Sequence, residues 1–238
     1  MIPLVYDQLN SCRIDEEFFV SLLDNLNVKN LADLGCGTGR LSTRFSEMGL
    51  RTTGIDPNAK AIEQAKLKEY ADQVNWIVGD STNLLASAYD VVIMTANVAQ
   101  VFLTDEIWTQ TISDVYGSLN NGGHFIFDTR NPLAKVWEEW EKDDTPDTAT
   151  DLESGDPLEI ITEDEGLTGE VYTFYESVRN TRSGQLLAHV KMQLRFRTYE
   201  ALVESLKGAG FAQIQAYGDW EFKKASSENR SFIFHCVK

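Results

Sequence analysis

The stretch Leu31-Ala-Asp-Leu-Gly-Cys-Gly-Thr-Gly39 decides the fold that the sequence predicts. An apolar run suited to a buried strand leads directly into glycines at positions 35, 37 and 39. Glycine allows a sharp turn and a close approach of the backbone to a ligand, and the free N–H groups of a following helix point into the same crevice. The stretch therefore predicts a strand that ends in a ligand-binding turn at the carboxyl edge of a sheet.

Short β-branched runs alternate with helical periodicities around this turn, from residue 28 to residue 130. This alternation is typical of a doubly wound α/β fold, in which helices cover both faces of a mostly parallel sheet. The expected strands are 30–34, 51–55, 74–78, 90–95 and 124–128, and the expected helices are 41–48, one opened by Pro57, and 104–119 with Thr104 as its N-cap.

The pattern changes after Arg130. Residues 143–156 contain six acids among small polar residues, and with no apolar face to bury they predict a mobile loop. Residues 169–178 and 185–198 alternate as strands do and flank a hairpin turn. A helix over 199–207 and strands over 211–220 and 230–237 complete a sheet of seven strands.

This order divides the chain into two expected domains. Residues 1–131 and 199–238 form the α/β domain with an N-terminal helical cap. Residues 132–198 form an antiparallel β insertion before the last helix.

Composition favours a globular protein of the cytoplasm. Among the 238 residues, 37 acids and 21 bases give a formal charge of -16, which repels nucleic acids and anionic membranes. Lys191, Arg195 and Arg197 alternate on an expected strand, either as a solvated face or as a local basic strip. The three cysteines form no CxxC pair, so that neither a disulfide framework nor a metal site is expected, and no segment has the length of a membrane span.

An acid at Asp56 closes the second expected strand, about 20 residues after the first glycine. A carboxylate at this place accepts hydrogen bonds from ribose hydroxyls, so that an adenosine-type ligand is indicated. Dinucleotide-binding folds require a third glycine where this chain has Arg40, which argues against NAD.

LADLGCGTG resembles the first motif of the class I S-adenosylmethionine-dependent methyltransferases, and the later strand ends follow that family to the end of the chain. TANVAQVFL at 95–103 and FDTRNP at 127–132 are similar to poorly characterised bacterial small-molecule methyltransferases. The family's nucleic-acid methyltransferases carry an N/D-P-P-Y/F motif after the fourth strand. This chain has Thr95-Ala-Asn-Val98 there, which counts against base methylation.

The insertion 132–198 resembles the lids of amino-sugar and amino-acid N-methyltransferases, so the resemblance implies a substrate lid there and a cofactor-binding domain over 1–131 and 199–238. It also implies S-adenosylmethionine as the cofactor and assigns its parts to the strand ends. The acid and the glycine turn of the first strand would hold the methionine part, the second strand end the ribose and one side of the adenine, and the third the adenine edge. The residue after the fourth strand would line the cleft beside the sulfonium. These cofactor-binding residues are Asp33, Gly35, Cys36, Gly37, Asp56, Pro57, Asp80, Ser81 and Asn97. Cys36 is interpreted as a small residue, because direct methyl transfer needs no nucleophile of the protein.

Candidates for the acceptor side come from the cap, the fifth strand end and the lid. Arg130 either binds a carboxylate or phosphate of the substrate or forms a salt bridge at the root of the lid. The lid aromatics either wall the acceptor or form the lid's own core. His189 suits a general base only if its face lines the cleft. The expected substrate-binding residues are Tyr6, Arg130, Asn131, Trp137 and Tyr175.

The function expected from these features is N- or O-methylation of a small molecule by direct in-line transfer. Two alternatives stay open. A non-catalytic S-adenosylmethionine-binding module is consistent with the absence of an identifiable catalytic base, and a nucleotide-linked oxidoreductase is disfavoured by Arg40.

Overall fold

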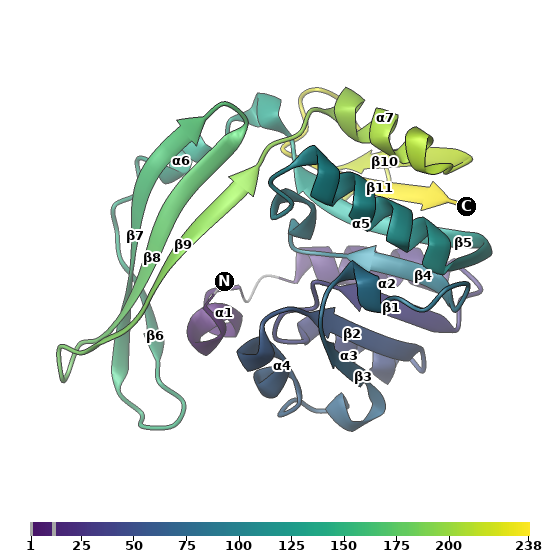
Figure 1. Ribbon diagram of the computed structural model, residues 1–238. Coiled ribbons are helices and arrows are strands. Elements are labelled where there is room, and N and C mark those ends of the chain that lie inside the picture. Colours follow the sequence, from purple (N-terminus) through teal and green to yellow (C-terminus); the bar gives the residue numbers. More distant parts are fainter. Residues whose placement is uncertain (1, 11–12) are drawn as a thin grey trace.

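The expected strands form one seven-stranded sheet in the computed structural model, which describes residues 2–10 and 13–238 (Figure 1). All neighbours in it are parallel except those of β11, which runs antiparallel to both β10 and β5. The predicted α/β fold class is confirmed. In spatial order the strands are β10 (Gln213–Gly218), β11 (Ser231–Val237), β5 (Leu119–Arg130), β4 (Tyr89–Met94), β1 (Asn30–Leu34), β2 (Arg51–Asp56) and β3 (Asn75–Val78).

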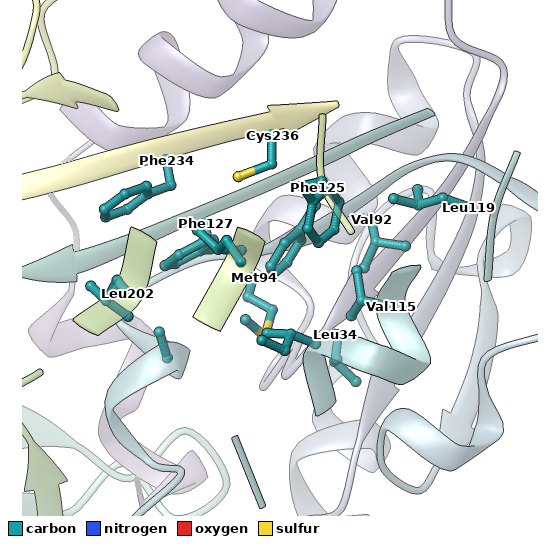
Figure 2. Packing of buried hydrophobic residues seen from close by; sticks show 14 of the residues in the cluster. Leu34, Val92, Met94, Val115, Leu119, Phe125, Phe127, Leu202, Phe234 and Cys236 are labelled. Carbon is teal, nitrogen blue, oxygen red and sulfur yellow. The ribbon is translucent and has the colours of Figure 1, made fainter. Parts of the chain in front are cut away.

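Helices cover both faces of this sheet. On one face, α5 (Asp105–Ser118) and α7 (Tyr199–Ala209) bury side chains against the core of Figure 2, which includes Val92, Phe127 and Phe234. On the other face, α2 (Ile14–Asp24) and α3 (Arg40–Glu47) pack Phe19 and Phe45 against the opposite side of the same strands. The shorter elements are α4 (Ala59–Ala65), η1 (Ala71–Gln73), η2 (Ser81–Asn83), η3 (Val98–Gln100), η4 (Pro132–Ala134) and α6 (Trp137–Trp140).

A second sheet, antiparallel throughout, stands beside the first (Figure 1). Its strands in order are β6 (Asp147–Thr150), β7 (Pro157–Thr168), β8 (Val171–Asn180) and β9 (Leu186–Arg195). The expectation of a mobile loop over 143–156 was wrong in its centre, because β6 pairs with β7 there. The side chains of Asp143, Asp144, Asp147 and Glu153 are exposed while the backbone joins the sheet, so composition alone did not reveal the strand.

Helix α1 (Pro3–Leu9) lies between the two sheets in Figure 1. Its Val5 is buried with Leu158, Ile160 and Val178 of the second sheet. Gln8 also exchanges two hydrogen bonds of 2.9 Å with the backbone of Thr150 on β6. The helix is thus attached to the edge and to one face of the second sheet.

The start of α4 differs from the prediction. Pro57 precedes the helix, and Asn58 is its N-cap, with a side chain that accepts hydrogen bonds from the N–H groups of Lys60 and Ala61. Thr104 caps α5 as expected, accepting from the N–H of Ile107. Pro57 remains outside the helix, where it lines the cavity described below.

Two histidines pair where β5 and β11 lie side by side. The ring nitrogens Nδ1 of His124 and Nε2 of His235 are 2.9 Å apart. Burial and, to a smaller extent, the neighbouring His124 lower the pKa of His235 to about 4. The fold therefore favours the neutral ring, so this contribution to stability is complete above the unfolded pKa of about 6.5 and is lost as the pH falls toward 4.

The substitution His235→Gln is expected to flatten the acid dependence of stability. The free energy of unfolding, from urea titrations between pH 7 and pH 4.5, will fall less with decreasing pH than in the parent chain. Gln215→Ala is the control, because Gln215 faces His235 from β10 and carries no titratable group. An equal pH slope for the parent and His235→Gln would contradict this assignment.

Candidate functional site

A cavity of about 550 Å³ opens at the carboxyl ends of the parallel strands. The chain runs from β1 outward to β2 and β3, then returns to place β4 on the other side of β1, so the order reverses beside the glycine turn. Crevices at such reversals are the usual ligand sites of open α/β sheets. Of the predicted cofactor residues, those lining the cavity are Gly35, Cys36, Gly37, Asp56, Pro57, Asp80, Ser81 and Asn97.

The carboxylate of Asp56 connects two of these strand ends. One oxygen accepts the N–H of Gly37 at 2.9 Å, and the other accepts the N–H of Asn58 at 2.8 Å. Burial raises the pKa of Asp56, and the two backbone hydrogen bonds oppose that rise. Each oxygen retains a lone pair, so Asp56 can hold the glycine turn and still accept donors from a ligand.

The glycines of the turn serve the packing of the protein as well as the ligand. A Cβ at Gly35, whose φ is +79°, would lie 2.7 Å from the methyl groups of Val98. A Cβ at Gly39 would lie 2.5 Å from the ring of Trp76, and Gly54 on β2 leaves room for the same ring. The sequence suggested clearance for a ligand at all three alternating glycines, whereas at Gly39 the nearest obstacle is Trp76.

Asp80 and Ser81 follow β3. One carboxylate oxygen of Asp80 accepts from the N–H and hydroxyl of Thr82, and these hydrogen bonds lower the pKa of Asp80. The hydroxyl of Ser81 donates to Asp114 of α5 at 2.7 Å. The second oxygen of Asp80 is left to accept from a ligand at the cavity wall.

Three buried side-chain oxygen atoms at or behind the cavity wall have no hydrogen-bond partner in the described chain. They are Oδ1 of Asp33, of Asn97 and of Asp128. Asp33 precedes the glycine turn and accepts from Ser42, and Asp128 accepts the N–H of Asn97. Burial raises the pKa of both Asp33 and Asp128 to about 7. Such carboxylates favour hydrogen-bond donors and positive charge nearby.

The backbone is strained at the same place. Ala96 and Asn97 have φ values of +55° and +62°, in the left-handed region that disfavours side chains other than glycine. The hydrogen bond from Asn97 to Asp128 supports this conformation. Strain of this kind persists where surrounding contacts fix it, and it is common beside binding sites.

Cys36, Arg40 of α3 and Tyr6 of the N-terminal cap complete the cofactor side. Burial raises the pKa of Cys36, with Asp33 and Asp56 adding repulsion, so this thiol is not a nucleophile at neutral pH. Arg40 lines the cavity and is held by Asp15 of α2 at 2.5 Å. Tyr6 of α1 lines it as predicted, and burial raises the pKa of its hydroxyl.

Arg130 lines the cavity from the end of β5. Its guanidinium donates to Gln100 at 2.8 Å and lies 5.0 Å from the ring centroid of Trp140 in α6. No carboxylate of the described residues forms an ion pair with it, so the alternative of a salt bridge at the lid root is wrong. Burial lowers the pKa of Arg130, and Asp128 partly compensates.

Four predicted site residues lie outside the cavity lining. Asp33 lies behind the wall. The side-chain amide of Asn131 donates to the carbonyl oxygens of Ser227 and Asn229 and accepts the N–H of Leu133, so it is already fully engaged. Trp137 packs on Phe196, 4.7 Å between centroids, within the second sheet's own core. Tyr175 stacks on His189 at 5.4 Å, on the side of β8 opposite the lining residues Phe174 and Glu176, so neither Tyr175 nor His189 faces the cavity.

The second sheet contributes lining residues that were not predicted. They are Ile160, Phe174, Glu176, Met192 and Leu194. Helix α1 and the two residues that flank it add Ile2, Val5, Leu9 and Asn10. The alternation of residues 172, 174, 176 and 178 carried the signal, because one face of a strand points in one direction. The sequence does not show which face meets the cavity.

The possible basic strip is occupied by the chain's own groups. Arg195 pairs with Asp105 at 2.9 Å and with Glu170 at 2.9 Å. Arg197 is buried and donates to the carbonyl oxygens of Phe102 and Thr104. These two arginines attach the end of β9 and the residues after it to the start of α5. They therefore form neither a solvated face nor a binding strip.

Residues 2–10 and 13–238 contain no group of three or more His, Cys, Asp or Glu placed to hold a metal ion. Within the same ranges, the structure has no helix with the length and apolarity to cross a membrane. Cys36 and Cys236 are buried free thiols, and Cys12 lies outside the described residues.

Comparison with known proteins points in one direction. Residues 31–123 match the family model of a methyltransferase domain. The glycine/sarcosine N-methyltransferase of Aphanothece halophytica is 26% identical over 230 residues, which cover 93% of this chain and 80% of that protein. Other curated relatives, at 30% and 31% identity, are matched over about half of their length, 55% and 43%.

Two solved structures share the whole architecture. An S-adenosylmethionine-dependent methyltransferase from Clostridium acetobutylicum superposes with a TM-score of 0.77 at 18% identity, covering 98% of this chain and 96% of the other. An amino pentose methyltransferase from Micromonospora echinaspora, solved with S-adenosylmethionine bound, gives 0.70 at 16% identity with the same coverage. At these identities the likeness concerns the fold.

The substitution Gly35→Ala is expected to destabilise the chain more than Gly49→Ala. Both glycines have positive φ, but a Cβ at Gly49 meets nothing within 4 Å, whereas one at Gly35 meets Val98. Gly49→Ala thus reports left-handed strain alone, roughly 1 to 2 kcal/mol, and Gly35→Ala adds the clash. Urea unfolding of both variants measures the difference, and equal losses would show that Val98 moves away freely.

Proposed function

Because this chain belongs to the class I S-adenosylmethionine-dependent methyltransferases, we propose that it transfers the methyl group of that cofactor to a nitrogen or oxygen of a small molecule. The observation that carries the proposal is the single cavity in which the glycine turn and Asp56 meet the second sheet. A cofactor and an acceptor therefore have one cavity to share.

The residues present fit S-adenosylmethionine. In the proposal Asp56 accepts from the ribose hydroxyls with the lone pairs that its backbone hydrogen bonds leave, and the free oxygen of Asp80 accepts from the adenine amino group. Pro57 provides an apolar surface for the adenine ring. The orphaned oxygens of Asp33, Asn97 and Asp128 favour a cationic ligand, and the cofactor carries an ammonium and a sulfonium.

Catalysis in this proposal depends on positioning. The bound cofactor supplies a methyl carbon activated by its positive sulfur, and the protein aligns the acceptor with that carbon and excludes water. Helix α1 closes the cavity, with Asp7 accepting the Thr38 hydroxyl at 2.6 Å and pairing with Lys68.

We also propose the division of the chain into a cofactor domain, 1–131 and 199–238, and a substrate lid, 132–198. The cavity wall from the lid is largely apolar, and Arg130 lies where the two parts meet. Arg130 would contact the acceptor, because it lines the cavity and no carboxylate of the described chain pairs with it. Nucleic acid is not the proposed acceptor, and buried free thiols at Cys36 and Cys236 suit the cytoplasm.

Replacing Asp56 by Ala is expected to weaken S-adenosylmethionine binding. Loss of the ribose hydrogen bonds costs about 1 to 3 kcal/mol, or roughly 5- to 150-fold in the dissociation constant by calorimetric titration. Asp72→Ala is the matched control, since Asp72 is exposed and outside the cavity. Unchanged affinity in a folded Asp56→Ala chain would refute the cofactor assignment.

A further inference from the structure

One charged side chain interrupts the wall that the second sheet gives to the cavity. The wall consists of Ile160, Phe174, Met192, Leu194 and Glu176. In the register of the sheet, Glu176 on β8 lies opposite Thr162 of β7 and Val190 of β9. Neither neighbour is a cation, so a carboxylate stands among uncharged side chains on a surface that is otherwise suited to apolar ligands.

Nothing in the described part of the chain compensates this carboxylate. Neither a hydrogen bond nor an ion pair with another described residue engages Glu176, which is half-buried. Burial raises its pKa, the positive charge of the amino terminus opposes that rise, and the negative charge of Asp147 adds to it. A buried carboxylate is costly unless a donor or a cation meets it, and the cavity is the side on which a ligand can do so.

We propose that Glu176 binds the methyl acceptor and that the acceptor is an amine on an apolar skeleton. This inference rests on the proposed methyltransferase function and narrows it to nitrogen. A protonated amine brings the opposite charge to Glu176, whereas an alcohol donates one hydrogen bond and leaves the charge uncompensated. The formal charge of -16 acts in the same direction, because its field attracts cations toward the chain.

The reaction balances with Glu176 as the counter-charge. The amine releases one proton to solvent on becoming neutral, and the nitrogen lone pair then forms the new N–C bond while the C–S bond breaks. The positive charge passes from sulfur to nitrogen, where the Glu176 carboxylate faces it. The products are a methylated ammonium ion, which exchanges its proton with solvent on release, and neutral S-adenosylhomocysteine.

Glu176→Gln tests the inference, because it keeps the shape of the side chain and removes the charge. Benzylamine and benzyl alcohol, then cyclohexylamine and cyclohexanol, are titrated into the S-adenosylhomocysteine complex. The parent chain is expected to bind each amine about tenfold or more tighter than its alcohol, and Glu176→Gln to lose that preference. Transfer of an isotope-labelled methyl group to the amines, followed by mass spectrometry, should decrease in parallel.

Glu163→Gln is the matched control, since Glu163 is exposed on β7 opposite Tyr175 and does not line the cavity. It should retain the preference for amines. Equal binding of amine and alcohol, no binding of either, or a preference that survives Glu176→Gln overturns the inference. S-adenosylhomocysteine affinity separates the two proposals: retained affinity without amine preference removes only the inference, whereas absent affinity removes the methyltransferase function as well.

Discussion

The hydrogen bonds of Asp56 to Gly37 and Asn58 are the constraint on which the site depends. They hold the glycine turn after β1 against the end of β2 and fix the approach to α4. Asn58 can then cap that helix, and Pro57 is turned toward the cavity. One carboxylate thus sets the relative position of two strand ends while its remaining lone pairs face the ligand space.

The two sides of the cavity, a rigid side and a second side, are held by different kinds of contact. Its rigid side consists of strand ends whose side chains are buried on both faces of the seven-stranded sheet. Its other side is the second sheet and α1, which packs Val5 on that sheet and is joined to the cofactor side by the polar contacts of Asp7. Polar surface contacts of this kind break at a lower free-energy cost than a packed core. Separating α1 from the cofactor side is therefore expected to cost less than disrupting the strand ends.

The sequence predicted the rigid side well and the other side poorly. Glycines at alternating positions and an acid after the next strand are local patterns, and Gly35, Asp56 and Asp80 lie where the sequence placed them. The lid differs, because the alternation of β8 identifies two faces without saying which one meets the cavity. Tyr175 was therefore expected on the wrong face, and Glu176, one residue further, was missed.

The distribution of charge around the cavity links these observations. Asp33 and Asp128 stand behind the cofactor side, where burial holds their pKa near 7, and Glu176 stands on the acceptor side. Carboxylates on both sides favour cations at both ends of the reaction path, first the sulfonium and then an amine. Methyl transfer removes the positive charge from sulfur, which weakens the attraction for the spent cofactor. The same carboxylates that favour binding would therefore favour release after transfer.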